Sequence, residues 1–433
     1  MSQIIDIAKQ AKKASIPMSA LSAKTKNNAL KAIANALVKA EAQIIEANTK
    51  DLQKAEQEKL AAPLLKRLKF DKNKIKEVVD GIESLIRLAE PVGQTLSATE
   101  LDNGLELYKV SCPIGVIGVI FESRPDALVQ ISSLCLKSGN AVLLKGGSEA
   151  LHTNRILTEI ITKASADAGI PQGWLHLLET RSDVNEMLKM DDYIDLIIPR
   201  GSNEFVKYIM DNSNIAVLGH ADGICHVYVD KEADIDMAVS VAADSKTQYV
   251  AVCNAAETLL VHSSIAPKFL PALKEKMDAL HVELRGCEKT LKYISVKPAS
   301  EQDWATEYLD YIWSVKVVDS MDEAIEHINK YGSGHTESII TKDNVAALKF
   351  MDLCDSGNVF WNASTRFSDG FRYGLGAEVG ISTNKIHARG PVGLEGLLIY
   401  KWKLIGNGQI VADYASGKKV FTHKKLDKKF NPS

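Results

Sequence analysis

Hydrophobic positions in the first 93 residues recur at steps of three and four, which is the spacing of one face of an α-helix. Lysine, asparagine, glutamine and glutamate separate them, and Pro17 and Pro63 interrupt the run. Typical members of the periodic set are Ile4, Ala8, Ala11, Leu30, Ile33 and Leu37. This part of the chain is therefore predicted to form packed helices, and it offers no candidate chemistry.

Residues 95–110 form two alternating segments on either side of Asp102-Asn103-Gly104. That pattern predicts a β-hairpin with a tight turn. A two-stranded hairpin alone is unstable in water. The hairpin must therefore pack on its own domain or on a partner subunit, and the pattern leaves both open.

From Ile114 onward, strands alternate with helices. The β-branched run from Ile114 to Ile120 predicts a strand buried on both faces. Further strands are expected over residues 141–145, 174–178, 194–198, 215–218 and 224–229, with helices over 126–138, 150–168 and 203–210. The predicted fold class is α/β with a doubly wound parallel sheet, and such sheets bind ligands outside the carboxyl ends of their strands.

Two of these strand ends combine a cation, glycine and a hydroxyl at the start of a helix, where free N–H groups favour anions. The residues are Lys145, Gly146, Gly147 and Ser148 in one turn and Arg200, Gly201 and Ser202 in the other. Neither turn matches a known phosphate motif, and an ordinary glycine turn explains either one alone. Together they favour a dinucleotide with an extra phosphate, because Lys145 can pair with a ribose 2′-phosphate.

A second α/β region follows an expected helix over residues 235–246. Cys253 and Asn254 lie in a small-residue turn directly before an apolar strand, residues 255–261. Such a turn can present a nucleophile beside backbone N–H groups that form an oxyanion hole. A single buried cysteine that only fills space is the alternative. Cys225 and His226 form a rival pair, but adjacent residues of a strand point to opposite faces.

Further helices are expected over residues 267–280, 321–329 and 346–353, and strands over 311–318 and 338–341. The glycine- and aromatic-rich stretch 357–376 is predicted to be a binding loop. Within it, Arg366 beside Ser364 and Thr365 is a candidate to hold a carboxylate bidentately, the alternative being a solvated arginine. A last strand is expected over 394–402, and the lysine-rich end after Ser416 is expected to be solvated and mobile.

Composition narrows the class of protein. A chain of 433 residues predicts two or three domains. The net charge of -3 argues against nucleic acid or an anionic membrane as partner. No apolar run approaches ~18 residues, and no secretory signal is visible. Six cysteines without metal-ligand spacing predict a cytoplasmic protein with reduced thiols and no metal site.

Several stretches together resemble the γ-glutamyl phosphate reductases, the proline-biosynthesis branch of the aldehyde dehydrogenase superfamily. The most specific are Phe121-Glu-Ser-Arg-Pro-Asp126 and Ala363-Ser-Thr-Arg-Phe367. The others lie within residues 115–126, 144–149, 198–202, 253–260, 334–339 and 360–370. The resemblance covers nearly the whole chain.

The resemblance implies an aldehyde dehydrogenase-like fold in three parts. Residues 1–94 and 112–232 are expected to form an NADP(H)-binding domain, and residues 233–393 a catalytic domain. An oligomerisation flap would combine residues 95–111 and 394–415, with 416–433 as a basic tail. The resemblance thus favours a homo-oligomer in which the hairpin contacts a partner subunit.

The reaction that the resemblance implies is reduction of L-glutamyl 5-phosphate by NADPH to glutamate 5-semialdehyde and phosphate. The Cys253 thiolate would displace phosphate to give a thioester, and hydride transfer would give a hemithioacetal that collapses to the aldehyde. Glutamate 5-kinase is the candidate partner that supplies the substrate. Direct transfer from that kinase, and the preference for NADPH over NADH, are left open.

Residue roles are carried over by position. Glu307 is expected to contact the nicotinamide ribose, and Arg124 to contact the substrate. The oxyanion asparagine of the superfamily is missing, so the Cys253 backbone N–H, with Ser123 or Asn254, is expected to replace it. Residues 219–226 lack the glutamate that activates water in hydrolytic relatives, which suits a thioester that must survive until it is reduced. Val250 stands where the resemblance leads us to expect proline.

Two other functions remain in view. An aldehyde-oxidising NAD(P)-dependent dehydrogenase would need a deacylating base or a coenzyme A site, and the sequence shows neither clearly. A non-catalytic nucleotide-binding scaffold is disfavoured by Cys253, the paired phosphate turns and the loop around Arg366.

Overall fold

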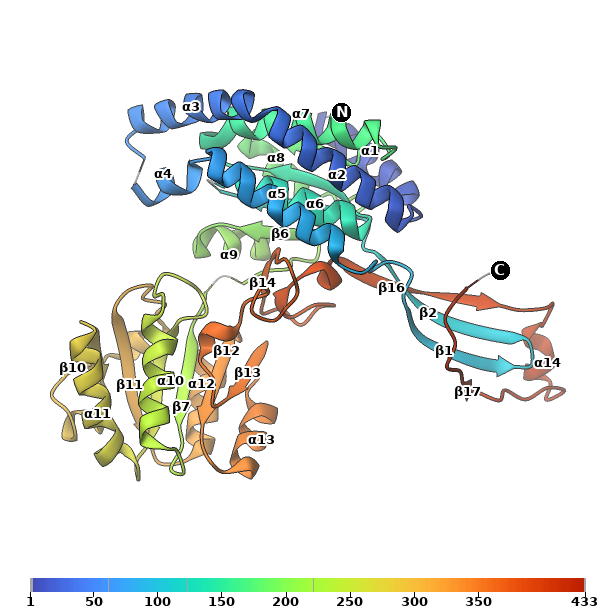
Figure 1. Cartoon of the computed structure of the whole chain (residues 1–433). Helices are drawn as coiled ribbons and strands as arrows, with labels where there is room; N and C mark the ends of the chain where they lie inside the picture. The colour runs from blue at the N-terminus through green and yellow to red at the C-terminus, as the bar shows by residue number, and fades with distance from the viewer. Residues whose placement is uncertain (1–2, 61, 123, 221, 432–433) are drawn as a thin grey trace. The chain divides into compact units, whose positions relative to one another are not determined.

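The computed structural model describes residues 3–60, 62–122, 124–220 and 222–431, and the chain divides into two compact units (Figure 1). The first unit contains residues 1–201, 208–217 and 392–433, and the second contains residues 202–207 and 218–391. Among the described residues, no helix is long and apolar enough to cross a membrane.

The first unit is built on a parallel sheet with the strand order β5-β4-β3-β6. Its strands are β3 (Val116–Phe121), β4 (Ala141–Lys145), β5 (Leu175–Leu178) and β6 (Leu196–Arg200). Every residue of β3 and β4 is buried, which explains why these strands read as continuous apolar runs. The strand order reverses between β3 and β6, so the switch point that binds ligands in such sheets lies at Phe121 and Arg200.

Helices pack on both faces of this sheet. The helices α6 (Pro125–Ser138) and α7 (Leu151–Asp167) connect β3 to β4 and β4 to β5, while α8 (Arg181–Met187) leads to β6 and contacts α1 (Gln3–Met18). An outer layer of helices packs on α6 and α7 and consists of α2 (Ala23–Lys39), α3 (Glu41–Gln57) and α5 (Lys72–Arg87). The short helix α4 (Ala62–Leu68) packs against α3. Because α2 and α5 cover it, α6 is buried along its whole length.

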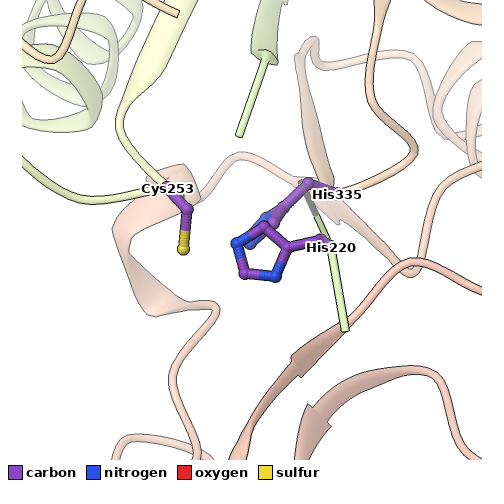
Figure 2. A group of neighbouring side chains, drawn as sticks. All are labelled: His220, Cys253 and His335. Carbon is purple, nitrogen blue, oxygen red and sulfur yellow. The ribbon is translucent and has the colours of Figure 1, made fainter. Parts of the chain in front are cut away.

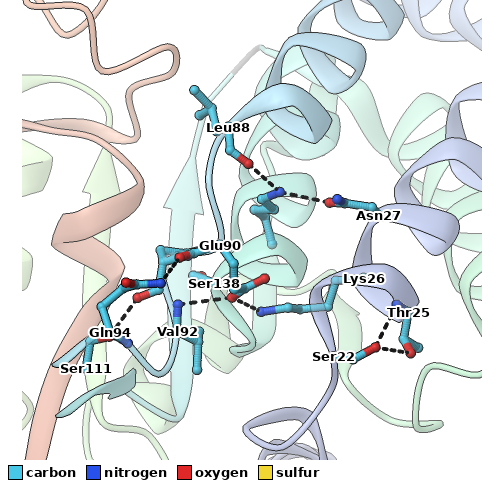
Figure 3. Close-up of polar contacts among 12 residues, drawn as sticks. Ser22, Thr25, Lys26, Asn27, Leu88, Glu90, Val92, Gln94, Ser111 and Ser138 are labelled. Atoms are coloured by element: carbon cyan, nitrogen blue, oxygen red, sulfur yellow. Dashed lines mark hydrogen bonds and ion pairs between the residues drawn. The ribbon is translucent and has the colours of Figure 1, made fainter. Parts of the chain in front are cut away.

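Two buried lysines, Lys26 and Lys137, fix this outer layer, and Figure 3 shows Lys26 with Glu90. Lys26 of α2 pairs with Glu90 at 2.5 Å, and Glu90 also accepts the backbone N–H of Val92. Lys137 of α6 donates to Asn27 at 2.8 Å and to the Leu88 carbonyl at 3.0 Å. These bonds hold the segment that leaves α5 and enters the hairpin.

The predicted hairpin is confirmed. Strands β1 (Thr95–Asp102) and β2 (Leu105–Pro113) pair antiparallel, and β2 also pairs with β16 (Leu398–Ile405), as expected for the flap. The turn contains Gly104 in the left-handed region at φ 71, and the register shifts between Glu100 and Asp102, as in a bulged turn. After β16, the short helix α14 (Val411–Ala415) precedes the tail.

The tail, which was expected to be solvated and mobile, is mostly exposed but also contacts the flap. Residues Lys424–Lys425 form β17, which pairs with β1 and completes a four-stranded sheet in the order β16-β2-β1-β17. Phe430 meets the Tyr108 ring edge-on at 5.3 Å, and Leu426 packs on the same cluster. The apolar residues among the lysines supply the burial that anchors this end.

The second unit contains a seven-stranded parallel sheet in the order β10-β9-β11-β8-β7-β12-β13. Its strands are β7 (Cys225–Val229), β8 (Ala256–His262), β9 (Glu283–Gly286), β10 (Lys297–Pro298), β11 (Ile312–Val318), β12 (Thr336–Ile340) and β13 (Asn358–Trp361). The helices α10 (Ile235–Thr247) and α11 (Ala266–Ala279) bury one face, and α12 (Met321–Tyr331) and α13 (Asn344–Leu353) bury the other. A small two-stranded sheet, β14 (Gly380–Ser382) with β15 (Gly390–Val392), follows.

Three predictions about this region need correction. Because β7 lies in the middle of the second sheet, the expected end of the first domain at residue 232 comes too late. Residues 215–218 form a single bridge, Ile197 to Val217, and no full strand. Strand β9 was not predicted, and β13 lies inside the expected loop 357–376. Both strands have four residues, which is too short for an alternation of apolar and polar positions to be recognised.

Candidate active site

Cys253 lies in the loop between α10 and β8, at the amino edge of the second sheet. The loops that enter β7, which is next to β8, and β12, which is next to β7, reach the same edge. The cysteine is partly exposed, and none of the six cysteines is in a disulfide. The rule that ligands bind at carboxyl ends thus applies to the phosphate turns of the first sheet and not to this cysteine.

The Cys253 backbone is held from two sides. A side chain on Gly223 would overlap the carbonyl oxygen and Cα of Cys253 and come within 2.6 Å of its Cβ. Only glycine therefore fits at position 223. The Cys225 thiol donates a hydrogen bond to the Cys253 carbonyl at 3.2 Å. Burial, reinforced by Glu337, raises the pKa of Cys225 well above its ordinary value, so this thiol stays protonated as a donor.

A buried ion pair fastens the two ends of the same loop. Lys246, in the last turn of α10, and Glu257, the second residue of β8, pair at 2.5 Å, and both side chains are fully buried. The Leu309 N–H donates to the other oxygen of Glu257 at 3.2 Å. Burial raises the pKa of Glu257 and lowers that of Lys246, and their mutual attraction opposes both shifts. The pair was not predicted from the sequence.

Two histidines face the cysteine (Figure 2). The Cys253 sulfur and a ring nitrogen of both His220 and His335 all lie within 4.8 Å of one another. Nδ1 of His220 lies 2.9 Å from the Ile381 carbonyl, and Nδ1 of His335 lies 2.8 Å from Thr336 Oγ1. Burial and the neighbouring His220 hold the pKa of His335 well below its ordinary value, so this ring is neutral at pH 7.

Neither histidine was predicted as a site residue, although each directly follows a glycine and precedes a buried strand. The shared signal is that loops entering β7, β8 and β12 carry a histidine, a cysteine and a histidine. It becomes visible only once the strand order is known. The rival pair, Cys225 and His226, separates as expected, because His226 bonds Glu337 at 3.0 Å on its own side of the sheet.

The predicted substrate residues lie around the 3₁₀ turn η4 (Thr365–Phe367). Thr365 donates its hydroxyl to the Asn254 carbonyl, and the Asn254 amide donates to the Ser368 carbonyl, both at 2.7 Å. Ser364 accepts the Arg366 backbone N–H at 3.2 Å and also bonds Ser245, so these hydroxyls fix the loop itself. The structure thus joins the cysteine loop to this turn.

The Arg366 side chain is mostly buried near Cys253. Its Nε donates to Gln248 at 2.9 Å, and among the described residues its terminal nitrogens have no hydrogen-bond acceptor. Burial and the charge of Arg372 lower its pKa. A buried guanidinium whose two terminal nitrogens can still donate is suited to an anionic ligand.

The first phosphate turn lies between β4 and η1 (Ser148–Ala150). Lys145 is buried and its ammonium donates to the Gly146 carbonyl at 2.5 Å, so the cation is turned into the loop. Side chains on the two glycines would overlap Asn154 and the Glu149 carboxylate. Asp51 accepts the N–H groups of His152 and Thr153, so part of the α7 terminus already carries an anion. The turn thus carries one buried cation, Lys145, and one carboxylate, Glu149, beside Gly147.

The remaining predicted residues separate between the two units. Arg200 and Gly201 end the first unit at the switch point, and Ser202 begins the second at the start of α9 (Asn203–Asn212). Arg124 lies in the first unit and pairs with Asp126 at 3.2 Å. Ser123 lies outside the described residues.

Glu307, in the second unit, bonds the Asn203 amide and the Gly223 backbone N–H. Burial raises its pKa. Its carboxylate is thereby placed against the glycine that backs Cys253.

Comparisons with known proteins agree with this architecture. The model of the aldehyde dehydrogenase family matches residues 1–311. The γ-glutamyl phosphate reductase of Acetivibrio thermocellus is 68% identical over 99% of this chain and 99% of its own, and that of Ruminiclostridium cellulolyticum 67% over 96% and 97%. The crystal structure of γ-glutamyl phosphate reductase from Thermotoga maritima superposes with a TM-score of 0.92 at 42% identity, covering 94% of this chain and all of that one.

Proposed function

Since this chain belongs to the aldehyde dehydrogenase family, and its full-length relatives are γ-glutamyl phosphate reductases, we propose that it reduces L-glutamyl 5-phosphate to glutamate 5-semialdehyde and phosphate. It is an oxidoreductase of proline biosynthesis on this account. The observation that carries the proposal is Cys253, held by Gly223 and Cys225 and faced by His220 and His335.

The first step is displacement of phosphate by the Cys253 sulfur. The S–C bond of a thioester forms, and the C–O bond to phosphate breaks. His220 accepts the thiol proton, because its Nδ1 is engaged with the Ile381 carbonyl and Nε2 keeps its lone pair. That proton then passes to the departing phosphate. The buried, neutral His335 packs against the His220 ring at 4.9 Å and holds it in place.

The second step reduces the thioester to a hemithioacetal, which collapses to the aldehyde and releases the thiolate. Bound NADPH supplies the hydride. Water must not reach the thioester first. Two glutamates near the cysteine loop are engaged elsewhere, Glu257 with Lys246 and Glu307 with Asn203. Neither is poised as the base that a hydrolytic dehydrogenase needs.

The stoichiometry tests this sequence of steps. With L-glutamyl 5-phosphate generated in the assay, NADPH oxidation and phosphate release are expected to run one to one. Phosphate released without NADPH oxidation, beyond the spontaneous rate, contradicts a protected thioester.

Arg366 holds the α-carboxylate of the substrate in this proposal. Replacing it with alanine removes a bidentate charged contact, so the KM for L-glutamyl 5-phosphate is expected to rise about 10- to 100-fold. Arg366→Lys keeps the positive charge but loses the bidentate hydrogen bonds, so its KM is expected to lie between those of the parent and of Arg366→Ala. An acyl phosphate without the α-carboxylate, such as butyryl phosphate, provides the control: with it, variant and parent should have the same KM. If KM rises equally for both acyl phosphates, Arg366 does not hold the α-carboxylate.

The cofactor is proposed to be NADP(H), with Lys145 at the 2′-phosphate and Gly147, Ser148, Arg200 and Gly201 as its further contacts in the first unit. Ser202 and Glu307 stay candidate cofactor contacts of the second unit. We expect Lys145→Met to weaken NADPH binding about 10-fold or more while NADH binding changes little. Glu149→Gln should act in the opposite direction by removing a negative charge beside Gly147. Binding is measured by the quenching of protein fluorescence, with thermal unfolding as the control for fold. If Lys145→Met weakens both cofactors equally, the lysine is structural and the preference is set elsewhere.

The flap supports a homo-oligomer. Strand β16 is an edge of the four-stranded sheet, and Ile399, Tyr400, Trp402, Leu404 and Ile405 are all exposed on it. An edge strand with this many exposed apolar residues is typical of a subunit contact. A cytoplasmic location and supply of the substrate by glutamate 5-kinase complete the proposal.

A further inference from the structure

Cys253, His220 and His335 have the composition and spacing of a metal site. Among the residues that the structure describes, they form the one cluster of His, Cys, Asp and Glu ligand atoms that lie within 4.8 Å of one another. The three side chains come from the loops before β8, β7 and β12, and they converge on one point (Figure 2). In a tetrahedral zinc site, bonds of about 2.0–2.3 Å place ligand atoms roughly 3.5 Å apart. Side-chain rotations that move each ligand atom by about 1 Å would therefore bring the three atoms to bonding distance from one ion.

The contacts behind the histidines match those of metal ligands. A ligating imidazole usually donates its second ring nitrogen to a carbonyl, carboxylate or hydroxyl, which fixes the ring and its tautomer. His220 makes such a contact to the Ile381 carbonyl at 2.9 Å, and His335 to Thr336 Oγ1 at 2.8 Å. Nε2 of His335 is buried and has no hydrogen-bond partner among the described residues. A buried nitrogen without a partner is costly, and a metal ion would satisfy it.

We propose that Cys253, His220 and His335 bind one soft divalent metal ion, Zn²⁺ above all, and that the bound ion reversibly blocks the nucleophile. The blocking of catalysis rests on the proposed function, but the binding itself does not. On binding, the Cys253 thiol loses its proton to solvent, an S–Zn bond and two N–Zn bonds form, and no group is oxidised or reduced. The fourth position is left for water.

The ligand set also selects the ion. One thiolate and two imidazoles suit Zn²⁺ and Co²⁺, whereas Mg²⁺ and Ca²⁺ require oxygen ligands. The nearby Arg366 repels cations, so binding depends on coordination rather than on a general negative potential. Mg²⁺ and Ca²⁺ are therefore expected to leave the enzyme unaffected.

Direct binding is the first test and needs no substrate. The full-length enzyme, freed of metal by a chelator, is titrated with Zn²⁺ in competition with a chromophoric chelator. One ion per chain is expected, and Co²⁺ should give a thiolate-to-cobalt charge-transfer band. Cys253→Ala should remove the site, and His220→Gln should weaken it about 100-fold. Binding that survives in both variants shows an adventitious ion elsewhere and overturns the proposal.

Matched controls exist within the chain. His281 is exposed with φ 57, a conformation that asparagine tolerates, so His281→Asn tests the loss of an exposed histidine outside the cluster. Cys112→Ser tests the loss of a partly exposed thiol in the flap. Both should bind Zn²⁺ like the parent. Because His335 is fully buried, zinc binding by His335→Ala is interpreted only if this variant unfolds at the same temperature as the parent. If it does not, the test depends on His220→Gln.

Alkylation and activity give two further readouts. Stoichiometric Zn²⁺ should slow iodoacetamide labelling of Cys253 at least tenfold while labelling of Cys112 and Cys287 is unchanged, and excess chelator should restore it. In the reductase assay, Zn²⁺ should inhibit at least tenfold, reversibly and without an effect of Mg²⁺. An enzyme that loses activity on metal removal and regains it with Zn²⁺ contradicts the proposal, since the ion would then be a resident cofactor. If binding and protection are observed but no reductase activity is found with or without metal, the proposed function fails and the site stands.

Discussion

Replacing Cys253 with alanine is expected to lower kcat for reduction of L-glutamyl 5-phosphate by about 10⁴-fold or more. The sulfur is the atom that carries the acyl group in this mechanism, and no neighbouring side chain can replace it. Cys225 is too well buried and too firmly protonated to act as a substitute nucleophile. The variant should still bind NADPH with the affinity of the parent, because the cofactor residues lie elsewhere.

Two controls make this result specific to thioester chemistry. Cys253→Ser keeps a nucleophilic atom but forms an ester that accepts hydride poorly, so it should also be inactive in reduction. Cys354→Ser alters a buried cysteine that follows the last residue of α13 and packs in an apolar cluster, and this variant should remain active. Activity in Cys253→Ala within tenfold of the parent would contradict the assignment of the nucleophile.

Replacing Gly223 with alanine is expected to lower kcat about 100-fold, although position 223 carries no reactive group. The added methyl overlaps the Cys253 carbonyl and Cα, so the cysteine loop must move. A displacement of about 1 Å in a reacting group can cost about 10²-fold in rate. The same change disturbs the Gly223 N–H that contacts Glu307.

Gly81→Ala is the matched control for this prediction. Gly81 lies exposed in α5, and a methyl group there meets nothing within 4 Å. It should leave kcat unchanged and raise stability by about 1 kcal/mol through helix propensity. A Gly223→Ala enzyme with normal kcat would show that Gly223 does not set the position of Cys253. If the unfolding temperature of Gly223→Ala falls sharply together with its kcat, Gly223→Ser should lose at least as much of both, because serine is no smaller than alanine.

The order of elements was predictable from the sequence because most of them are long and strongly patterned. The strand from Val116 to Phe121 is buried on both faces and reads as an unbroken apolar run, and the hairpin carries its own turn signal. The assignment of strands to sheets was not predictable. Strand β7 reads like a continuation of the first sheet, and only its pairing with β8 and β12 places it in the second.

The candidate site was predictable in part for a related reason. Cys253 and Arg366 stand out by residue type and by the small or polar residues around them. His220 and His335 are 115 residues apart and become neighbours of the cysteine only through the strand order of the second sheet. Lys246 and Glu257 were missed because buried ion pairs leave no local pattern.

The tail shows how composition can mislead. Lysines dominate residues 418–429, and a run of like charges is usually solvated. Here Leu426 and Phe430 find an apolar cluster on Tyr108, while Lys428 pairs with Glu106 at 2.7 Å. The lysines stay exposed as expected, while the contacts of Leu426 and Phe430 depend on a surface from a distant part of the chain.

The most direct test of the central claim is the reverse reaction, since L-glutamyl 5-phosphate is unstable. Glutamate 5-semialdehyde and NADP are supplied with and without inorganic phosphate, and NADPH formation is followed by absorbance. NADPH is expected only when phosphate is present, because phosphate must release the acyl group from Cys253. NADPH formed at the same rate without phosphate would mean that water releases the acyl group, and the enzyme would then be a hydrolytic aldehyde dehydrogenase.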